Sequence, residues 1–103
     1  MASIIVSPSA DADMGEILED LAKKSGARTA AKYDQRFDDL YSHLSLYPES
    51  CPRRPKLSAQ TRIGIALPYI VLYRYSKSDD AVIIQRIVHG HRRLTGKLLR
   101  EEK

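Results

Sequence analysis

Cysteine is nearly absent from this chain of 103 residues, and long apolar runs are absent altogether. The single cysteine, Cys51, has no partner for an internal disulfide, which argues against a disulfide-stapled secreted domain. The longest strongly apolar stretch, residues 65–73, is interrupted by Pro68, whereas a membrane-spanning helix needs about 18 apolar residues or more. The first residues also lack the cationic and apolar regions of a signal peptide. We therefore expect a cytoplasmic protein without a membrane span.

Several motifs of catalytic and ligand sites are missing as well. The sequence has no metal-ligand spacing, no Gly-rich phosphate loop and no serine-nucleophile turn, so we expect no metal and no cofactor. Cys51 lies between Ser50 and Pro52 without a catalytic partner nearby, and we expect an ordinary, partly buried loop thiol. The chain is long enough for one compact core but not for two. Residues 1–103 are therefore predicted to form a single domain, with a basic tail from about residue 91.

Charge is present but unevenly distributed. Residues 1–51 carry 5 Lys/Arg and 9 Asp/Glu, whereas residues 52–103 carry 12 Lys/Arg and 4 Asp/Glu. The second half is thus strongly basic within a chain of net charge +4. Such a bias favours an anionic partner, which nucleic acid, an acidic protein segment or a membrane surface would each satisfy, while a merely solvated basic face is the alternative.

The first half of the sequence predicts a strand followed by two helices. Residues 3–6 are β-branched and apolar, and Ser7 and Pro8 suit the N-cap and the first position of a helix that Gly26 ends. A second apolar stripe, with spacings of three and four, predicts a helix that Pro48 closes. Its buried residues are predicted to be Ala30, Tyr33, Phe37, Leu40, Leu44 and Tyr47. The short connection makes the two helices an antiparallel hairpin.

The apolar period changes to two in the second half. Strands are predicted at residues 61–67, 69–75 and 81–89, and their short connections indicate an antiparallel meander. The fold class is therefore α+β, in the order β-α-α-β-β-β, with the helix hairpin packed on one face of a mainly antiparallel sheet. We expect the other face or its rim to stay open and to receive a partner. In the tail, a short helix is predicted from Leu94, Leu98 and Leu99.

Two long segments resemble ParE-type toxins of the ParE/RelE superfamily. The opening IIVSPSADADMGEILEDLAKKSG is similar to the family's first strand, Ser-Pro step and acidic helix. The closing YIVLYRYSKSDDAVIIQRIVHGHRRL resembles its Tyr-rich strand, polar turn and final strand ending in Arg-x-x-His-Gly-x-Arg. The residues that carry this second likeness are Tyr69, Tyr73, Arg74, Arg86, His89, Gly90 and Arg92. The likeness runs in the right order from residue 3 to about residue 94.

The resemblance implies a RelE-like fold and the toxin of a type II toxin-antitoxin module, of the kind linked to plasmid stabilisation. In the ParE branch, the toxin inhibits DNA gyrase by binding, is neutralised by a ParD-like antitoxin and meets DNA only through that antitoxin. In the RelE branch, it is a ribosome-dependent mRNA endonuclease. A third alternative is a non-toxic relative that acts in an autoregulatory antitoxin complex. We favour the non-enzymatic binding inhibitor.

The candidate site residues lie in the basic half. A ribonuclease needs a general base, a cation for the phosphate and a general acid, and its candidates are His89, His91, Arg86 and Arg92. Arg86 lies in an apolar strand, so it either pairs with an N-terminal acid or points to the open face. His89 either serves such a site or caps the last strand. The surface for target and antitoxin is predicted to use Arg53, Arg54, Arg62, Tyr73, Arg74, Arg86, His89, Arg92 and Arg93.

Overall fold

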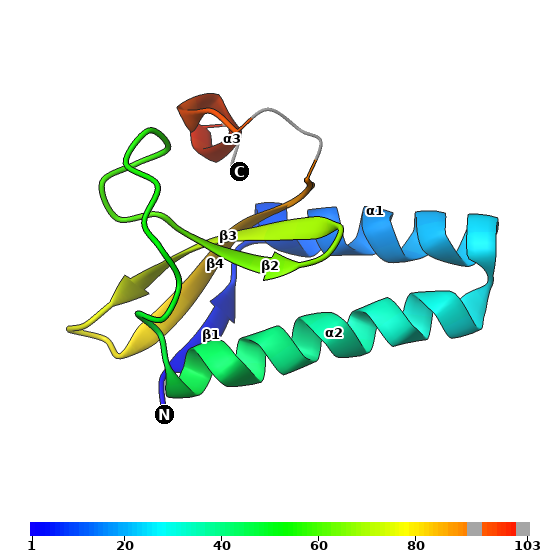
Figure 1. The fold of residues 1–103 in the computed structure, drawn as a ribbon, viewed down its shortest axis with the longest axis horizontal. Coiled ribbons are helices and arrows are strands. Elements are labelled where there is room, and N and C mark those ends of the chain that lie inside the picture. Colours follow the sequence, from blue (N-terminus) through cyan, green and yellow to red (C-terminus); the bar gives the residue numbers. More distant parts are fainter. Residues whose placement is uncertain (91–93, 101–103) are drawn as a thin grey trace.

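A computed structural model describes residues 1–90 and 94–100, and within them the chain forms four strands and three helices (Figure 1). In chain order these are β1 (Ser3–Val6), α1 (Pro8–Ser25), α2 (Ala27–Leu46), β2 (Arg62–Ala66), β3 (Tyr69–Ser76), β4 (Ala81–His89) and α3 (Gly96–Arg100). The predicted α+β class and the order β-α-α-β-β-β are confirmed. Helix α3 is the short tail helix that the leucines predicted.

Helix α1 begins and ends where the sequence predicted. The Oγ of Ser7 accepts a hydrogen bond from the backbone N–H of Ala10 at 3.1 Å, and Pro8 occupies the first turn, where a missing N–H costs nothing. Gly26 follows α1 with a φ of 93°, a conformation that glycine adopts without strain. Because this one residue connects α1 to α2, the helices run back antiparallel, as Figure 1 shows.

Helix α2 buries most of its predicted stripe. Phe37 and Leu44 are fully buried, and Tyr33 and Leu40 are partly buried. The prediction was wrong for Tyr47, whose side chain is 58% exposed. The reason is local: α2 ends one residue earlier, and the backbone of Tyr47 leaves the helical conformation at φ −132° and ψ 67°. The tyrosine therefore turns away from the face that the helical period would give it.

The sheet has the strand order β1-β4-β3-β2. Strands β2, β3 and β4 form the predicted antiparallel meander. Strand β1 adds a parallel partner on the far side of β4, where Ser3 lies opposite Ala81 and Val6 opposite Ile84. Strands β3 and β4 are thus central, which accounts for apolar residues on both of their faces.

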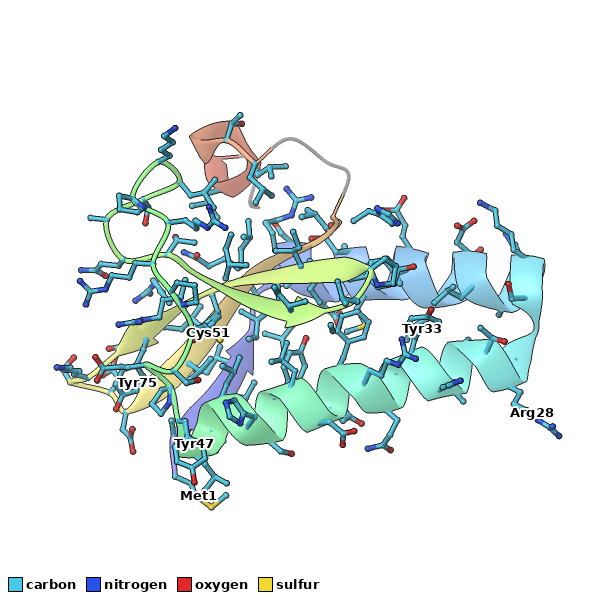
Figure 2. The ribbon with its side chains drawn as sticks, viewed as in Figure 1. Met1, Arg28, Tyr33, Tyr47, Cys51 and Tyr75 are labelled. Carbon is cyan, nitrogen blue, oxygen red and sulfur yellow. The ribbon has the colours of Figure 1, made fainter. Side chains whose placement is uncertain are left out.

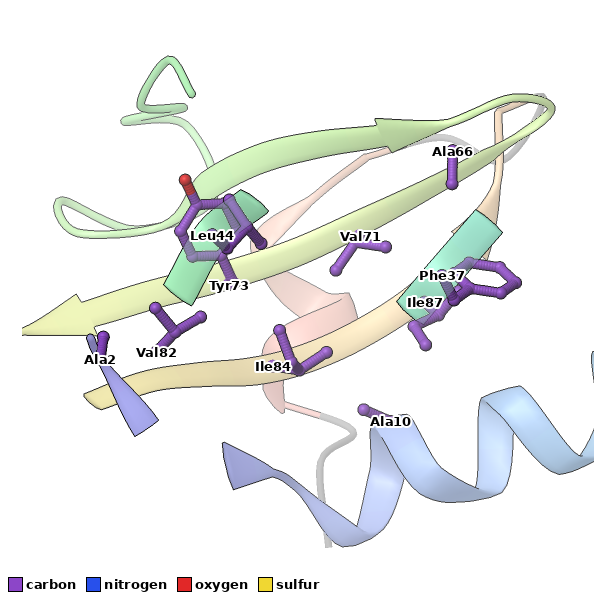
Figure 3. Packing of buried hydrophobic residues seen from close by; sticks show 10 residues of the cluster. All are labelled: Ala2, Ala10, Phe37, Leu44, Ala66, Val71, Tyr73, Val82, Ile84 and Ile87. Atoms are coloured by element: carbon purple, nitrogen blue, oxygen red, sulfur yellow. The ribbon is translucent and has the colours of Figure 1, made fainter. Parts of the chain in front are cut away.

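The face of the sheet toward α1 and α2 carries the main core (Figure 3). Its buried residues are Ala2, Ala10, Phe37, Leu44, Ala66, Val71, Tyr73, Val82, Ile84 and Ile87. Small residues of β2 let α2 approach closely: a Cβ at Gly64 would lie 3.3 Å from a methyl group of Leu40. The helix hairpin therefore seals this face with contacts drawn from every strand.

The opposite face is not open as predicted. Helix α3 and the loop between α2 and β2 lie above the sheet in Figure 1, on the side away from α2. They cover a second, smaller cluster of buried residues: Leu57, Ile63, Leu72, Val88 and Leu98. The exposed apolar residues of the sheet lie at its rim instead, where Ile65 and Leu67 are 61% and 72% exposed at the β2 edge. The expectation of an open rim therefore holds, and that of an open face does not.

Candidate functional site

The edge of β4 beyond β1 is capped by side chains of the Ser7–Asp13 segment. Strand β1 ends opposite Ile84, although β4 continues to His89. The hydroxyl of Ser7 donates to the backbone carbonyl of Gln85 at 2.9 Å, and the Oδ2 of Asp13 accepts from the N–H of Ile87 at 2.9 Å. These side chains satisfy backbone groups that a further strand would otherwise pair.

Arg86 is held by the same carboxylate. Its Nε and Nη2 donate to the two oxygens of Asp13 at 2.7 and 3.0 Å, and its Nη1 donates to the carbonyl of Leu98 at 2.9 Å. Only 8% of Arg86 is exposed. Of the two alternatives for this arginine, pairing with an N-terminal acid is therefore correct. A bidentate buried pair of this kind joins α1, β4 and α3 and leaves little of the guanidinium for a ligand.

Tyr73 and Arg62 also have internal partners. Tyr73 is fully buried, its hydroxyl donates to the carbonyl of Pro48 at 3.0 Å, and burial raises its pKa above the usual value. Arg62 donates to the carbonyls of Cys51 at 2.7 Å and Glu49 at 3.1 Å, with its side chain 12% exposed. Both residues tie the loop after α2 to the sheet, so the predicted surface role does not fit Tyr73. Cys51 is the partly buried loop thiol that was expected.

His89 ends β4 on an acidic groove. Its ring meets the edge of Tyr69 at 5.6 Å between centroids, and it lies beside a hollow of about 570 Å³ along α1. Four acids line this hollow, Asp13, Glu16, Glu19 and Asp20, together with the cation of Lys23, which pairs with Glu19 at 2.9 Å. An anionic phosphate is poorly suited to such a lining. His91, Arg92 and Arg93, the other predicted members of this site, lie outside the described residues.

Two basic hollows flank the loop between α2 and β2. The first, which we call the loop groove, has about 470 Å³ and is lined by Pro52, Arg53, Arg54, Pro55, Lys56, Leu57 and Leu94. The second, the hairpin groove, has about 420 Å³ and lies between this loop and the β3–β4 hairpin. It is lined by Glu49, Arg53, Gln60, Arg62, Arg74, Tyr75, Ser76, Lys77 and Ser78.

The fold thus brings together only part of the predicted surface. Arg53, Arg62 and Arg74 share the hairpin groove, and Arg54 lines the loop groove. Sequence reasoning missed Lys77, because a lysine in a polar turn has the pattern of a solvated charge. Lys56, in the basic loop between α2 and β2, was not among the predicted site residues either. Each lysine belongs to a groove because of the residues that surround it in the fold. These residues are distant in sequence or are brought close by the path of the loop.

The described residues provide no sign of a metal site or a membrane span. No three His, Cys, Asp or Glu side chains among residues 1–90 and 94–100 come close enough to hold a metal ion. Over the same residues, no helix combines the length and the apolar character required to span a bilayer.

A comparison with protein families identifies the group to which the chain belongs. The family model for the ParE toxin of the type II toxin-antitoxin system, parDE, matches residues 4–94. The chain is a member of the ParE toxin family. The match extends from β1 past the end of β4, so it includes both segments that carry the resemblance.

A named relative and two solved structures are similar to this ParE-family chain over most of its length. Toxin ParE3 of Caulobacter vibrioides is 26% identical over 98 residues, which are 95% of this chain and 96% of the relative. In the chromosomal ParDE toxin-antitoxin system from P. aeruginosa, a chain matches with a TM-score of 0.72 and 21% identity, covering 86% of this chain and 96% of that one. In the RelBE2 toxin-antitoxin complex from Mycobacterium tuberculosis, a chain matches with a TM-score of 0.53 and 25% identity, covering 85% and 96%. The RelE-like fold is confirmed.

Proposed function

We propose that this ParE-family protein is the toxin partner of a ParD-like antitoxin and that it inhibits DNA gyrase in the cytoplasm by binding, without cutting a substrate. The observation that carries the proposal is the state of Arg86. Its guanidinium is 8% exposed and is bound by Asp13 and the carbonyl of Leu98. This arginine is one of the two candidate cations for a nuclease site at His89, and the other is Arg92.

The argument against cleavage is one of chemistry. Cutting RNA at a 2′-hydroxyl requires a base, an acid and a cation that stabilises charge on the phosphate. Within the described residues His89 faces acids of α1 instead, and these acids would repel a phosphate. The RelE-like alternative then depends on His91 and Arg92, so it remains the competing outcome of the experiment below.

The loop groove and the β2 edge support an antitoxin path. The groove combines an apolar lining, including Leu57 and Leu94, with the cations of Arg53, Arg54 and Lys56. After this loop, β2 forms one edge of the sheet, and Ile65 in β2 and Leu67 just beyond it are exposed. An antitoxin segment that is disordered when free and carries both acidic and apolar residues fits such a path. Bound there, it would neutralise basic surface that the toxin needs for its target.

A paired assay tests the target. Purified protein is added to a gyrase supercoiling reaction and to a translating extract. We expect loss of supercoiling and intact mRNA. Codon-dependent cuts in mRNA, with supercoiling unaffected, would replace the proposal by the RelE-like endonuclease. Activity in neither assay, together with tight antitoxin binding and operator binding by the complex, would indicate the non-toxic autoregulatory relative.

A charge-reversal pair tests the antitoxin surface. Arg54→Glu with Lys56→Glu should weaken antitoxin binding about tenfold or more, because two attractive charges become repulsive at the groove rim. The matched control is Arg28→Glu with Lys32→Glu, which makes the same charge change at exposed positions near the α1–α2 turn. Equal affinity of both variants in calorimetry would remove the loop groove from the antitoxin path.

A further inference from the structure

The hairpin groove differs in its lining from the loop groove that we assign to the antitoxin, although the two share Arg53. Its cations come from separate parts of the chain: Arg53 from the loop, Arg62 from β2, and Arg74 and Lys77 from the β3–β4 hairpin. Figure 2 shows Tyr75, which also lines the groove, at the opposite end of the molecule from Arg28. The fold therefore brings four cations together at the end of the molecule away from the α1–α2 turn.

The acids near this groove are already engaged. Glu49 lies 3.5 Å from the guanidinium of Arg62 and 3.8 Å from the ammonium of Lys77. Asp80 accepts a hydrogen bond from the hydroxyl of Tyr75 at 2.7 Å, and Asp79 accepts one from the hydroxyl of Ser76 at 3.2 Å.

Two of the cations have no such partner. Within the part of the chain that the structure describes, neither Arg53 nor Arg74 forms an ion pair. Four cations and the single carboxylate of Glu49 line the groove, which is therefore cationic overall. The guanidinium groups of Arg53 and Arg74 are available to an anion, and Lys77, whose side chain is 76% exposed and 3.8 Å from Glu49, presents its ammonium group to solvent as well.

The rest of the lining favours phosphate over an acidic peptide. Gln60 supplies an amide, one of the side-chain groups that commonly contact a phosphodiester backbone alongside Arg and Lys. The hydroxyl groups of Ser76 and Ser78 also line the groove, where they bond each other at 3.3 Å and Ser76 donates to Asp79 at 3.2 Å. A peptide that wraps a surface also needs apolar anchors, and the loop groove offers them through Leu57 and Leu94. The aromatic ring of Tyr75 is the one large apolar group in the hairpin groove.

The same lining favours a duplex over a single strand. Proteins that hold single strands stack successive bases on several aromatic side chains. Tyr75 is the sole aromatic residue of this groove, and its hydroxyl is held by Asp80. A duplex keeps its bases stacked inside and carries its phosphates on the outside, where a groove lined by cations can contact them.

We propose that the hairpin groove binds the phosphate backbone of duplex DNA directly, through Arg53, Arg74 and Lys77. This differs from the expectation that the protein meets DNA only through its antitoxin. The proposal goes beyond gyrase inhibition and does not depend on it. A toxin that held the DNA on which gyrase acts would gain a second contact without any base-specific recognition.

The test measures binding of the full chain to a fluorescent 20-base-pair duplex by anisotropy over a range of salt concentrations. Arg74→Glu with Lys77→Glu should weaken binding at low salt at least tenfold and reduce the slope of log affinity against log salt by about 2. Arg28→Glu with Lys32→Glu has the same net charge but alters neither groove, and it should change affinity less than threefold. Thermal melts establish that both variants fold, and Arg74→Gln with Lys77→Gln repeats the test without new acids.

Four results would overturn the proposal. The first is no duplex binding at low salt, and the second is an equal loss of duplex affinity in the groove variant and its control. The third is tighter binding of single-stranded RNA than of the duplex. The fourth is a groove variant that loses affinity for the antitoxin but keeps its affinity for the duplex. Because gyrase is absent from the assay, its outcome is independent of the supercoiling result. A groove variant that loses DNA but still inhibits supercoiling leaves both proposals standing as separate contacts.

Discussion

The two faces of the sheet differ in how they are covered, and the difference separates stability from accessible chemistry. The face toward α1 and α2 is sealed by two helices of 18 and 20 residues over ten buried residues. The other face buries five residues beneath a proline-containing loop and a helix of five residues. Both basic grooves lie along that loop. The loop and α3 cover their face only partly and leave room for charged grooves, whereas α1 and α2 supply most of the core.

The largest expected effect lies on the helix-covered face. Phe37→Ala removes a fully buried ring and should lower the free energy of unfolding by roughly 3 to 5 kcal/mol, a large part of the stability of a small domain. Urea denaturation followed by circular dichroism measures it. A loss below about 1 kcal/mol would mean that this face does not dominate stability.

The next effect concerns the ion pair of Asp13 and Arg86, which joins α1 to the sheet. Asp13→Ala should cost about 3 kcal/mol, because the Arg86 guanidinium and the N–H of Ile87 both lose their partner. Replacing both partners, with Asp13→Leu and Arg86→Met, should recover most of that loss. The exposed Glu16→Ala serves as control, within about 0.5 kcal/mol of the unmodified protein. A double variant as unstable as Asp13→Ala would contradict this account.

A smaller effect is expected where the cover is thin. Leu98→Ala on α3 should cost about 1 to 2 kcal/mol, below the usual range for a buried leucine, because a five-residue helix can detach locally without unfolding the main core. Hydrogen exchange of β4 amides would report such an opening. If Leu98→Ala cost as much as Phe37→Ala, the two faces would be energetically equivalent.

The smallest effects distinguish two buried hydroxyl groups. Tyr73→Phe should cost about 1 kcal/mol, since it leaves the carbonyl of Pro48 without its donor. Tyr41→Phe should be neutral or slightly stabilising, because the buried Tyr41 hydroxyl has no hydrogen-bond partner among the described residues. Equilibrium unfolding of the two variants side by side decides this, and equal costs would mean that the hydroxyl of Tyr41 is also satisfied.

The same tyrosines predict the alkaline behaviour. Burial, with smaller contributions from nearby carboxylates, raises the pKa of Tyr41 to about 12, and burial also raises the pKa of Tyr73. The unfolded chain then loses these protons first, so the contribution of these two tyrosines to stability should be constant below about pH 10 and should fall as the pH rises toward 12. Tyr41→Phe should make that fall shallower. An identical pH profile for this variant would exclude Tyr41 as a cause.

Local features of the fold could be predicted because neighbouring residues encode them. Ser7 and Pro8 start a helix through backbone groups within one turn, and Gly26 ends it through its own φ. The change of apolar period from helical spacing to alternation likewise needs no knowledge of distant contacts. The prediction that Tyr47 is buried failed because the helical period of apolar residues indicates which side of a helix a residue occupies but not where the helix stops.

The candidate site could be predicted only as a set of cations. The basic half of the chain pointed to Arg53, Arg62 and Arg74, which do share the hairpin groove. It did not separate the available guanidinium groups from those that have internal partners. Arg62 donates to carbonyls 11 and 13 residues away in sequence, and Arg86 pairs with Asp13, which is 73 residues away. Charge is visible in a sequence, whereas its neutralisation depends on which side chains meet in space.

The helices, the strands, their order along the chain and the family could be predicted from short segments, because caps, apolar periods and family motifs are local. The parallel pairing of β1 with β4, the cover of α3 and a loop over the second face, and the contact of Asp13 with Arg86 became visible only in the folded chain. Folding also made Lys77 part of a groove with Arg53. These features join residues far apart in sequence, and their energies come from burial and pairing that exist only once the chain has folded.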